Sequence, residues 1–235
     1  MTSGSLHNAS WLVTDRTVGA SQGAFALGNL AVHVGDDPAA VAANRRALAD
    51  LLGVPQVVFT RAAHSATVTY VDRIVPDVPD SDGLVTDRPD LAIAAQGADC
   101  AMVALTTADG WIAAVHCGWK GLVLGVVPAA LEVMRTAGST LEDPRAHVGP
   151  TICPRCYPVD PQRAAEVAAV APDAVVEHGG TPAVDLRAGL TAQLAEHGVR
   201  ADWDPRCTAE DPDLYSHRRD GVTGRQALSI IRRAA

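Results

Sequence analysis

Three residues in the first half of the chain could together bind a metal ion: His64, Cys100 and His116. Cys100 begins the apolar run CAMVALT, His116 ends the run WIAAVH, and the Asp-Gly pair of the intervening TADG segment predicts a β-hairpin. A turn centred near Ala108 would set Cys100 almost opposite His116, with Cβ atoms roughly 4.5–5.5 Å apart. His64, at the end of a neighbouring strand, would add a third ligand. Three such ligands with an open fourth position are typical of catalytic zinc.

The same residues also have a simpler interpretation. A cysteine on an apolar strand is often a small buried hydrophobe, and both histidines could be ordinary core or surface residues. Spacing alone leaves the two interpretations open.

Two further segments could bind an anion. HCGWKGL (116–122) joins a strand to a helix through two glycines and carries Lys120 near the expected helix start, which suits phosphate but equally suits a tight turn with a solvated lysine. SHRRDGVTGRQ (216–226) gathers Arg218, Arg219 and Arg225 around two glycines, as an anion-binding loop or a basic surface turn.

The remaining cysteines predict no second metal site. Cys153 and Cys156 form CPRC, but the sequence has no second CxxC to complete a four-cysteine zinc site, so we expect this pair not to bind metal. Cys117 follows His116 and should face the opposite side of its strand, in the core. We expect Cys207 to be a packing residue. The tryptophans of the HCGW and ADWD segments should be structural.

The pattern of the whole chain predicts one mixed α/β domain over residues 1–235, with a mixed sheet sandwiched with helices. Asp37, Pro38 and Gly53 mark the start and stop of a helix over 37–53. A second helix, over 121–138, should be perturbed at Pro128. Further helices are expected near 161–170 and 185–197, and strands at 56–60, 66–71, 91–95, 100–106, 111–116 and 227–232.

Composition narrows the class of partner. A net charge of −8 argues against binding to nucleic acid or to an anionic membrane surface, so small molecules are the expected partners. The start MTSGSLHNAS lacks the features of a secretory signal, and no apolar run is long enough for a membrane span, which predicts a cytoplasmic protein. Five cysteines without a framework spacing favour thiols or metal ligands over disulfides.

Read together, these segments resemble the multicopper polyphenol oxidoreductase family, the laccase-domain proteins. The similarity runs nearly the full length of the chain, through GNLAVHVGDDPAAVAANRRAL (28–48), RAAHSATV (61–68), GADC (97–100), AAVHCGWKGL (113–122), HVGPTICPRCYPV (147–159) and CTAEDPDLYSHRRDGVTGRQA (207–227). Members of the family act as purine nucleoside phosphorylases and adenosine deaminases. The resemblance therefore implies a single α/β domain, a monomer, and zinc bound by His64, Cys100 and His116.

The implied function is a zinc-dependent phosphorylase that acts on adenosine, inosine, guanosine and methylthioadenosine, with adenosine deamination as an additional activity. Phosphate and a purine nucleoside would then be the partners. We expect Lys120, Arg218 and Arg219 to bind the anion and Asp99 to transfer a proton. Copper is the alternative metal, but multicopper oxidation fits poorly because the eight histidines include no His-x-His pair.

The chain departs from the family pattern at four places. Ala63 and Ser65 flank His64 where the family has glutamine-valine before the histidine and glycine after it, Lys120 replaces an arginine, Met102 replaces a proline, and Pro158 replaces an acidic residue. Because these residues surround the expected site, the substrate can differ from that of other family members. Editing of a peptidoglycan precursor, to which the family has also been linked, and a non-catalytic metal-binding scaffold are the competing functions.

Overall fold

The computed structural model describes residues 1–234, and these form two six-stranded sheets and one two-stranded sheet. The first sheet has the order β1-β2-β14-β7-β3-β5 and the second β13-β10-β8-β9-β6-β4. The strands of the first sheet are β1 (Thr2–Leu6), β2 (Ala9–Val13), β14 (Gln226–Arg232), β7 (Ala92–Gly97), β3 (Val57–Arg61) and β5 (Val78–Pro79). Those of the second are β13 (Arg200–Trp203), β10 (Arg145–Val148), β8 (Ala101–Thr106), β9 (Ile112–Cys117), β6 (Gly83–Thr86) and β4 (Val68–Tyr70).

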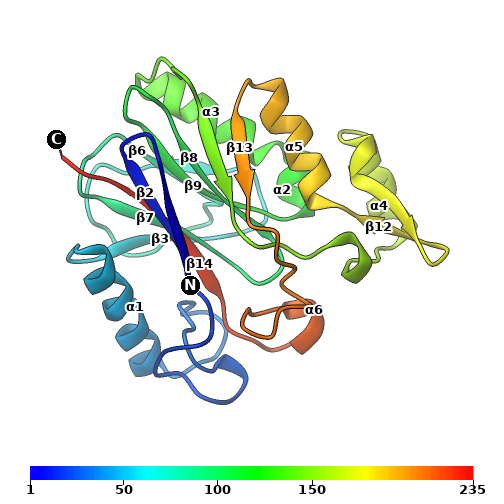
Figure 1. Ribbon diagram of the computed structural model, residues 1–235, viewed down its shortest axis with the longest axis horizontal. Coiled ribbons are helices and arrows are strands. Elements are labelled where there is room, and N and C mark those ends of the chain that lie inside the picture. Colours follow the sequence, from blue (N-terminus) through cyan, green and yellow to red (C-terminus); the bar gives the residue numbers. More distant parts are fainter. Residues whose placement is uncertain (235) are drawn as a thin grey trace.

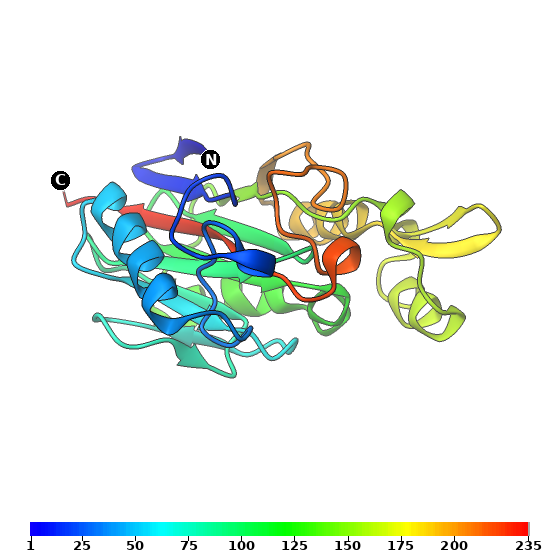
Figure 2. The ribbon, with the colours of Figure 1, turned by 90° about the horizontal axis from the view of Figure 1, so that it is seen from below.

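Helices cover the outer face of each sheet. They are α1 (Pro38–Leu52), α2 (Trp119–Leu124), α3 (Val126–Ala137), α4 (Pro161–Ala168), α5 (Leu186–Glu196) and α6 (His217–Asp220), with short 3₁₀ turns at Gly23–Phe25, Pro154–Cys156 and Pro172–Ala174. Figure 1 shows α1 on one side of the strands and α3 and α5 on the other. The hairpin of β11 (Val175–His178) and β12 (Thr181–Val184) projects with α4 from one end of the molecule (Figures 1 and 2).

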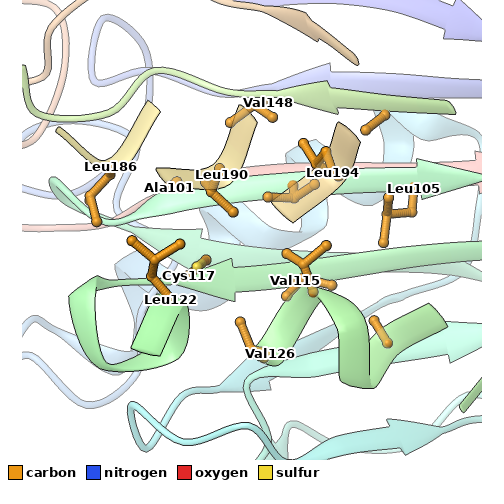
Figure 3. Packing of buried hydrophobic residues seen from close by; sticks show 14 of the residues in the cluster. Ala101, Leu105, Val115, Cys117, Leu122, Val126, Val148, Leu186, Leu190 and Leu194 are labelled. Atoms are coloured by element: carbon orange, nitrogen blue, oxygen red, sulfur yellow. The ribbon is translucent and has the colours of Figure 1, made fainter. Parts of the chain in front are cut away.

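Three apolar clusters join these layers. Ile93 and Ile230 of the first sheet pack with Met102 and Ile112 of the second between the two sheets. On the outer side of the first sheet, α1 packs against Phe59 and its neighbours. On the outer side of the second sheet, the side chains of β8, β9 and β10 meet those of α2, α3 and α5 (Figure 3). The layers are therefore helix, sheet, sheet and helix, which confirms the mixed α/β prediction and adds a second sheet to it.

The helix predicted over 37–53 is confirmed, and so are the residues predicted to begin and end it. The Asp37 side chain accepts a hydrogen bond from the Ala39 N–H, Pro38 occupies the first turn, and Gly53 ends the helix with φ +64°. Cys117 is fully buried in the cluster under α2, as predicted (Figure 3). None of the described helices is long and apolar enough to cross a membrane.

Several elements differ from the prediction. The segment over 121–138 is two helices, α2 and α3, that meet at Gly125 with φ +74°, while Pro128 lies in the first turn of α3, where its missing N–H costs no intrahelical bond. The polar start forms a hairpin of β1 and β2, and β2 pairs with the last strand, β14. The strands β5, β6 and β10–β13 were also not predicted, because runs of two to four residues are too short to show a repeating pattern.

Candidate metal and active site

The structure brings His64, Cys100 and His116 together. Each residue offers one ligand atom, and the three atoms lie within 4.8 Å of one another. The two imidazole rings meet edge to face, with centroids 5.0 Å apart. His116 and Cys100 come from the β9 and β8 ends of the hairpin, and His64 from the loop after β3. Thiolate and imidazole are ligands that suit a borderline-soft ion, so this group could hold a metal.

The register of the hairpin differs from the prediction by two residues. His116 lies opposite Met102, not Cys100, because the turn holds five residues and the last pair is Thr106 with Ile112. Since side chains alternate between the faces of a strand, a shift of two residues keeps Cys100 on the same face as Met102 and therefore on the face of His116. The two ligands are diagonal neighbours and still share one site.

Asp82, which the sequence analysis missed, organises both histidines. Its buried carboxylate lies 2.9 Å from Nδ1 of His116, which leaves Nε2 of that ring free to face Cys100. The same carboxylate accepts hydrogen bonds from the backbone N–H groups of Ala63, His64 and Ser65, at 3.1, 3.0 and 2.8 Å. These bonds hold His64 in the left-handed region, with φ +57°. In the sequence Asp82 lies in SDG, which reads as an ordinary turn.

Gly118 leaves space for the side chains of Cys100 and His64. A Cβ at this position would lie 2.8 Å from Sγ of Cys100 and 3.5 Å from Cδ2 of His64. Its φ of −83° is open to any residue, so the constraint is the close approach and not the backbone conformation. The glycine of the HCGW segment is therefore part of the site.

Opposite charges stabilise the ionised forms of Cys100 and His116. Burial by itself would raise the pKa of Cys100, but the charges and hydrogen bonds of His116 and His64 outweigh it and lower that pKa to about 6. Burial opposes the charge on His116 as well, yet the Cys100 thiolate and Asp82 raise its pKa to about 9. For Asp82, burial is overcome by the hydrogen bonds from His116 and Ser65, which lower its pKa to about 2. Cys100 is thus prepared as a thiolate, the form that binds metals.

His64, Cys100 and His116 line a cavity of about 440 Å³. This volume lies in the range of small-molecule sites, roughly 300–1,000 Å³. The walls combine aromatic, basic and neutral polar side chains, among them Trp119, Tyr157, Arg163, Arg218, Arg225, His33, Gln96 and Thr60. Trp119, which we expected to be structural, therefore faces the cavity.

Asp99 and Arg218, two of the predicted catalytic residues, also line this cavity. The Asp99 carboxylate is already hydrogen-bonded on both oxygens, by the Thr208 hydroxyl at 2.7 Å and the Arg218 backbone N–H at 2.7 Å. Asp99 thus anchors the first turn of α6, which carries Arg218. The Arg218 guanidinium lies over the ring of Tyr157 and donates to the Pro158 carbonyl at 3.0 Å.

Lys120 and Arg219 lie elsewhere. Lys120 is exposed on α2, with its ammonium near the Trp119 ring, and is not among the residues that line the cavity. Arg219 donates to the backbone carbonyls of Thr208 and Leu214 and pairs with Asp220, so its guanidinium braces the loop before α6. The structure therefore does not bring these two residues to the ligand group.

Two further arginines line the cavity: Arg163, which the sequence did not suggest, and Arg225, which belongs to the predicted anion-binding loop. Arg163, from α4, stacks over Trp119, and its buried Nε has no hydrogen-bond partner among the described residues. Arg225 precedes β14, and burial lowers its pKa. The side-chain oxygens of Gln96 and Thr60 are also buried and unpartnered in residues 1–234. The cavity thus presents donors and acceptors that a polar ligand would satisfy.

Comparison with known proteins identifies the family. The family model described as "Multi-copper polyphenol oxidoreductase laccase" matches residues 10–233. The chain belongs to this family. Among curated members, a protein of Mycobacterium tuberculosis (strain ATCC 25618 / H37Rv) named purine nucleoside phosphorylase is 47% identical over 225 residues, which is 93% of this chain and 90% of that protein. One from Streptomyces coelicolor with the same enzyme name is 45% identical and covers 94% and 95% of the two chains.

Solved structures of similar proteins share the fold. The crystal structure of YlmD from Geobacillus stearothermophilus superposes with a TM-score of 0.89 at 30% identity, and the alignment covers 97% of this chain and 93% of that one. The Neisseria meningitidis protein NMB0706 gives a TM-score of 0.88 at 32% identity, over 97% and 95%. The arrangement of two sheets is thus common to this chain and these two proteins.

Proposed function

We propose that this chain is a zinc-dependent purine nucleoside phosphorylase whose active site is the cavity above His64, Cys100 and His116. The observation that carries the proposal is the meeting, in one cavity, of a metal-ligating group with three arginines and two aromatic rings. The relatives named purine nucleoside phosphorylase support it, because the similarity extends over more than nine tenths of this chain.

Zinc is the metal that the donor set fits best. One thiolate and two imidazoles are common zinc ligands, and the Asp82 carboxylate on the far nitrogen of His116 matches the carboxylate–histidine pair that orients zinc-bound imidazoles. When bound, a zinc ion here would supply a Lewis acid beside the substrate. Copper could bind to the same residues, but oxidation by copper would not require the arginines that line the cavity.

Phosphate is the anion that the cavity suits. Phosphorolysis breaks the bond between C1′ and a purine nitrogen, and the electron pair of that bond leaves with the base. A phosphate oxygen forms the new bond to C1′, and the proton that phosphate carries passes to the base. The guanidinium groups of Arg163, Arg218 and Arg225 can hold phosphate by charge-assisted hydrogen bonds, which offsets its desolvation. Holding both reactants in one cavity removes the entropic cost of bringing them together.

The base would lie against the aromatic side of the cavity. Trp119 and Tyr157 offer flat apolar surfaces, and a purine is a flat aromatic ring. The unpartnered oxygens of Gln96 and Thr60 can accept hydrogen bonds from N–H or O–H groups of base or sugar. Adenosine, inosine, guanosine and methylthioadenosine all satisfy these requirements.

Adenosine deamination is a second activity that the same site could support. Three protein ligands leave one position open to the cavity, so a water molecule can approach an adenine ring there. In that reaction water adds at C6 and ammonia leaves, without phosphate.

The test is a panel of nucleosides assayed with and without phosphate. We expect free base and ribose 1-phosphate to form from inosine and adenosine only when phosphate is present. Ammonia release from adenosine without phosphate would report deamination. Cleavage of a nucleotide-linked muropeptide but not of nucleosides would replace the proposal with precursor editing, and no turnover by zinc-loaded protein would leave a binding function.

Arg218→Ala separates anion binding from metal binding. We expect the KM for phosphate to rise by at least about tenfold, as expected when a charged hydrogen bond is lost, while the zinc content stays constant. Lys120→Ala is the matched control, since it removes an exposed cation outside the cavity. If the two variants changed the phosphate KM equally, the arginine cavity would not be the phosphate site.

A further inference from the structure

A second group of possible metal ligands lies in two loops that the active site does not use. The segments CPRC (153–156) and CTAE (207–210) each place a ligand at their first and fourth positions. One ligand atom from each of Cys153, Cys156, Cys207 and Glu210 lies within 4.8 Å of the others. CPRC was not expected to bind metal because the sequence has no second CxxC. The fold brings a C-x-x-E segment to the place where that second pair would be.

Both segments form tight turns that aim their ligands inward. The N–H of Cys156 donates to the carbonyl of Cys153 at 3.0 Å, and the N–H of Glu210 donates to the carbonyl of Cys207 at 3.2 Å. A bridge between Thr151 and Cys207 fixes the two turns side by side. Two such turns facing each other form the usual frame of a structural zinc site.

Short contacts hold the sulfur and oxygen atoms of this cluster close together. The backbone N–H of Cys153 donates to Sγ of Cys207 at 3.2 Å, a bond that strengthens when the sulfur is a thiolate. Oε1 of Glu210 lies 3.7 Å from Sγ of Cys153 and 3.7 Å from Sγ of Cys156. In a tetrahedral zinc site with bonds of about 2.0–2.3 Å, neighbouring ligand atoms are roughly 3.3–3.8 Å apart.

Arg155 supplies a counter-charge. Its Nη2 donates to Oε1 and Oε2 of Glu210 at 2.9 and 3.0 Å. Three thiolates and one carboxylate around a divalent ion leave a charge of −2, and this guanidinium offsets half of it. The bond to Oε2 can persist while Oε1 binds a metal, so Arg155 orients the carboxylate.

We propose that Cys153, Cys156, Cys207 and Glu210 form a second zinc site, structural and four-coordinate, which ties the loop before α4 to the loop before α6. On binding, Zn²⁺ replaces the protons of three thiols, three Zn–S bonds and one Zn–O bond form, and three protons leave to solvent. No electron transfer is involved. With four protein ligands the site is closed, unlike the three-ligand group at His64, Cys100 and His116.

The test is a zinc count on the full chain, expressed in zinc-containing medium and purified under reducing conditions without chelators. We expect about two zinc ions per chain in the unaltered protein, about one in Cys100→Ser and about one in the double variant Cys153→Ser/Cys156→Ser. Combining all three changes should leave none. A count of one that survives Cys100→Ser and is lost in the double variant would support this site while contradicting zinc at the first.

A second measurement guards against a double variant that does not fold. In the unaltered protein Cys153, Cys156 and Cys207 should resist alkylation and become reactive after a strong chelator removes zinc, as read by mass spectrometry. Glu210→Gln should lose this protection faster than Glu177→Gln, a change at an exposed glutamate of β11. An unchanged zinc count in the double variant, equal rates in the two glutamine variants, or a Cys153–Cys156 disulfide in reduced protein would overturn the proposal.

Discussion

The two cysteine-containing groups of this molecule use the same element, sulfur, in opposite electrostatic surroundings. Cys100 faces two histidines, whose charges overcome burial and lower its pKa to about 6. Cys156 faces other thiols, and burial together with the hydrogen bond to Cys153 raises its pKa to about 12. The neighbours of a thiol therefore decide whether it is a thiolate before any metal arrives.

The number of ligands separates the groups as well. His64, Cys100 and His116 leave a position open toward a cavity of about 440 Å³. In the second group the CPRC and CTAE turns supply four ligands. If both proposals hold, one fold prepares a reactive three-ligand site and a structural four-ligand site with nearly the same residue types, through differences in charge and ligand number.

The largest expected contrast is in activity. Cys100→Ser should lower kcat/KM for inosine by more than about 100-fold, since even residues that only orient metal ligands cost 10–100-fold. Cys153→Ser should lower it by less than about tenfold, because that residue acts on the cavity only through the loop that carries Tyr157. Steady-state assays with phosphate measure both. Similar losses of kcat/KM in the two variants would contradict the assignment of one group as reactive and the other as structural.

Asp82→Asn tests how the active-site ligands are held. The amide cannot accept from His116 and from three backbone N–H groups as the carboxylate does, so zinc affinity should fall by about 10–100-fold. Competition with a chromophoric chelator gives the affinity. Asp87→Asn, at the carboxylate that pairs with Tyr70, is the control and should leave it unchanged. An unaltered zinc affinity in Asp82→Asn would remove this residue from the site.

Gly118→Ala tests the close approach to Cys100. The added Cβ would lie 2.8 Å from Sγ, so the thiolate must move by several tenths of an ångström. We expect a loss of activity of roughly tenfold, since a misplacement of about 1 Å can cost about 100-fold. Thermal unfolding should change little, because φ is already negative. Full activity would mean that the metal ligands tolerate the shift.

The smallest effect is a pH difference between the thiols of metal-free protein. The folded pKa of Cys100 is lowered to about 6, so its thiolate persists as pH falls from 9 and is lost only near pH 6. Cys156, with a pKa raised to about 12, should react more slowly than Cys100 at each pH below about 10, although faster than it does when zinc is bound. Iodoacetamide labelling followed by peptide mass spectrometry gives both profiles. If the two cysteines lost reactivity over the same pH range, the contrast in charge would be wrong.

The sequence predicted those elements whose own residues mark them, by capping residues or by a continuous apolar run. The capping residues Asp37 and Gly53 and the apolar runs of β7, β8 and β9 are of this kind. β1 and β2 were missed because β2 joins the sheet through β14, which is more than 200 residues away, and β1 pairs only with β2. The hairpin register was off by two residues because the sequence does not show how many residues the turn holds.

Some residues of the candidate site could be predicted from the sequence, and others only from the fold. His64, Cys100 and His116 come from motifs, but Asp82 reads as a turn residue and Arg163 as a helix surface residue until the fold places them. Lys120 had the right charge in the right segment, yet its helix turns it outward. Charge and residue type are visible in sequence, whereas direction depends on packing.

The central claim is that zinc binds to His64, Cys100 and His116 in the working enzyme. X-ray diffraction from crystals of untreated protein, measured on both sides of the zinc absorption edge, tests it most directly. We predict an anomalous peak at bonding distance from Sγ of Cys100 and from one nitrogen of each histidine, about 2.3 and 2.0–2.1 Å. The absence of a peak there, in protein that turns over nucleosides with phosphate, would contradict the account.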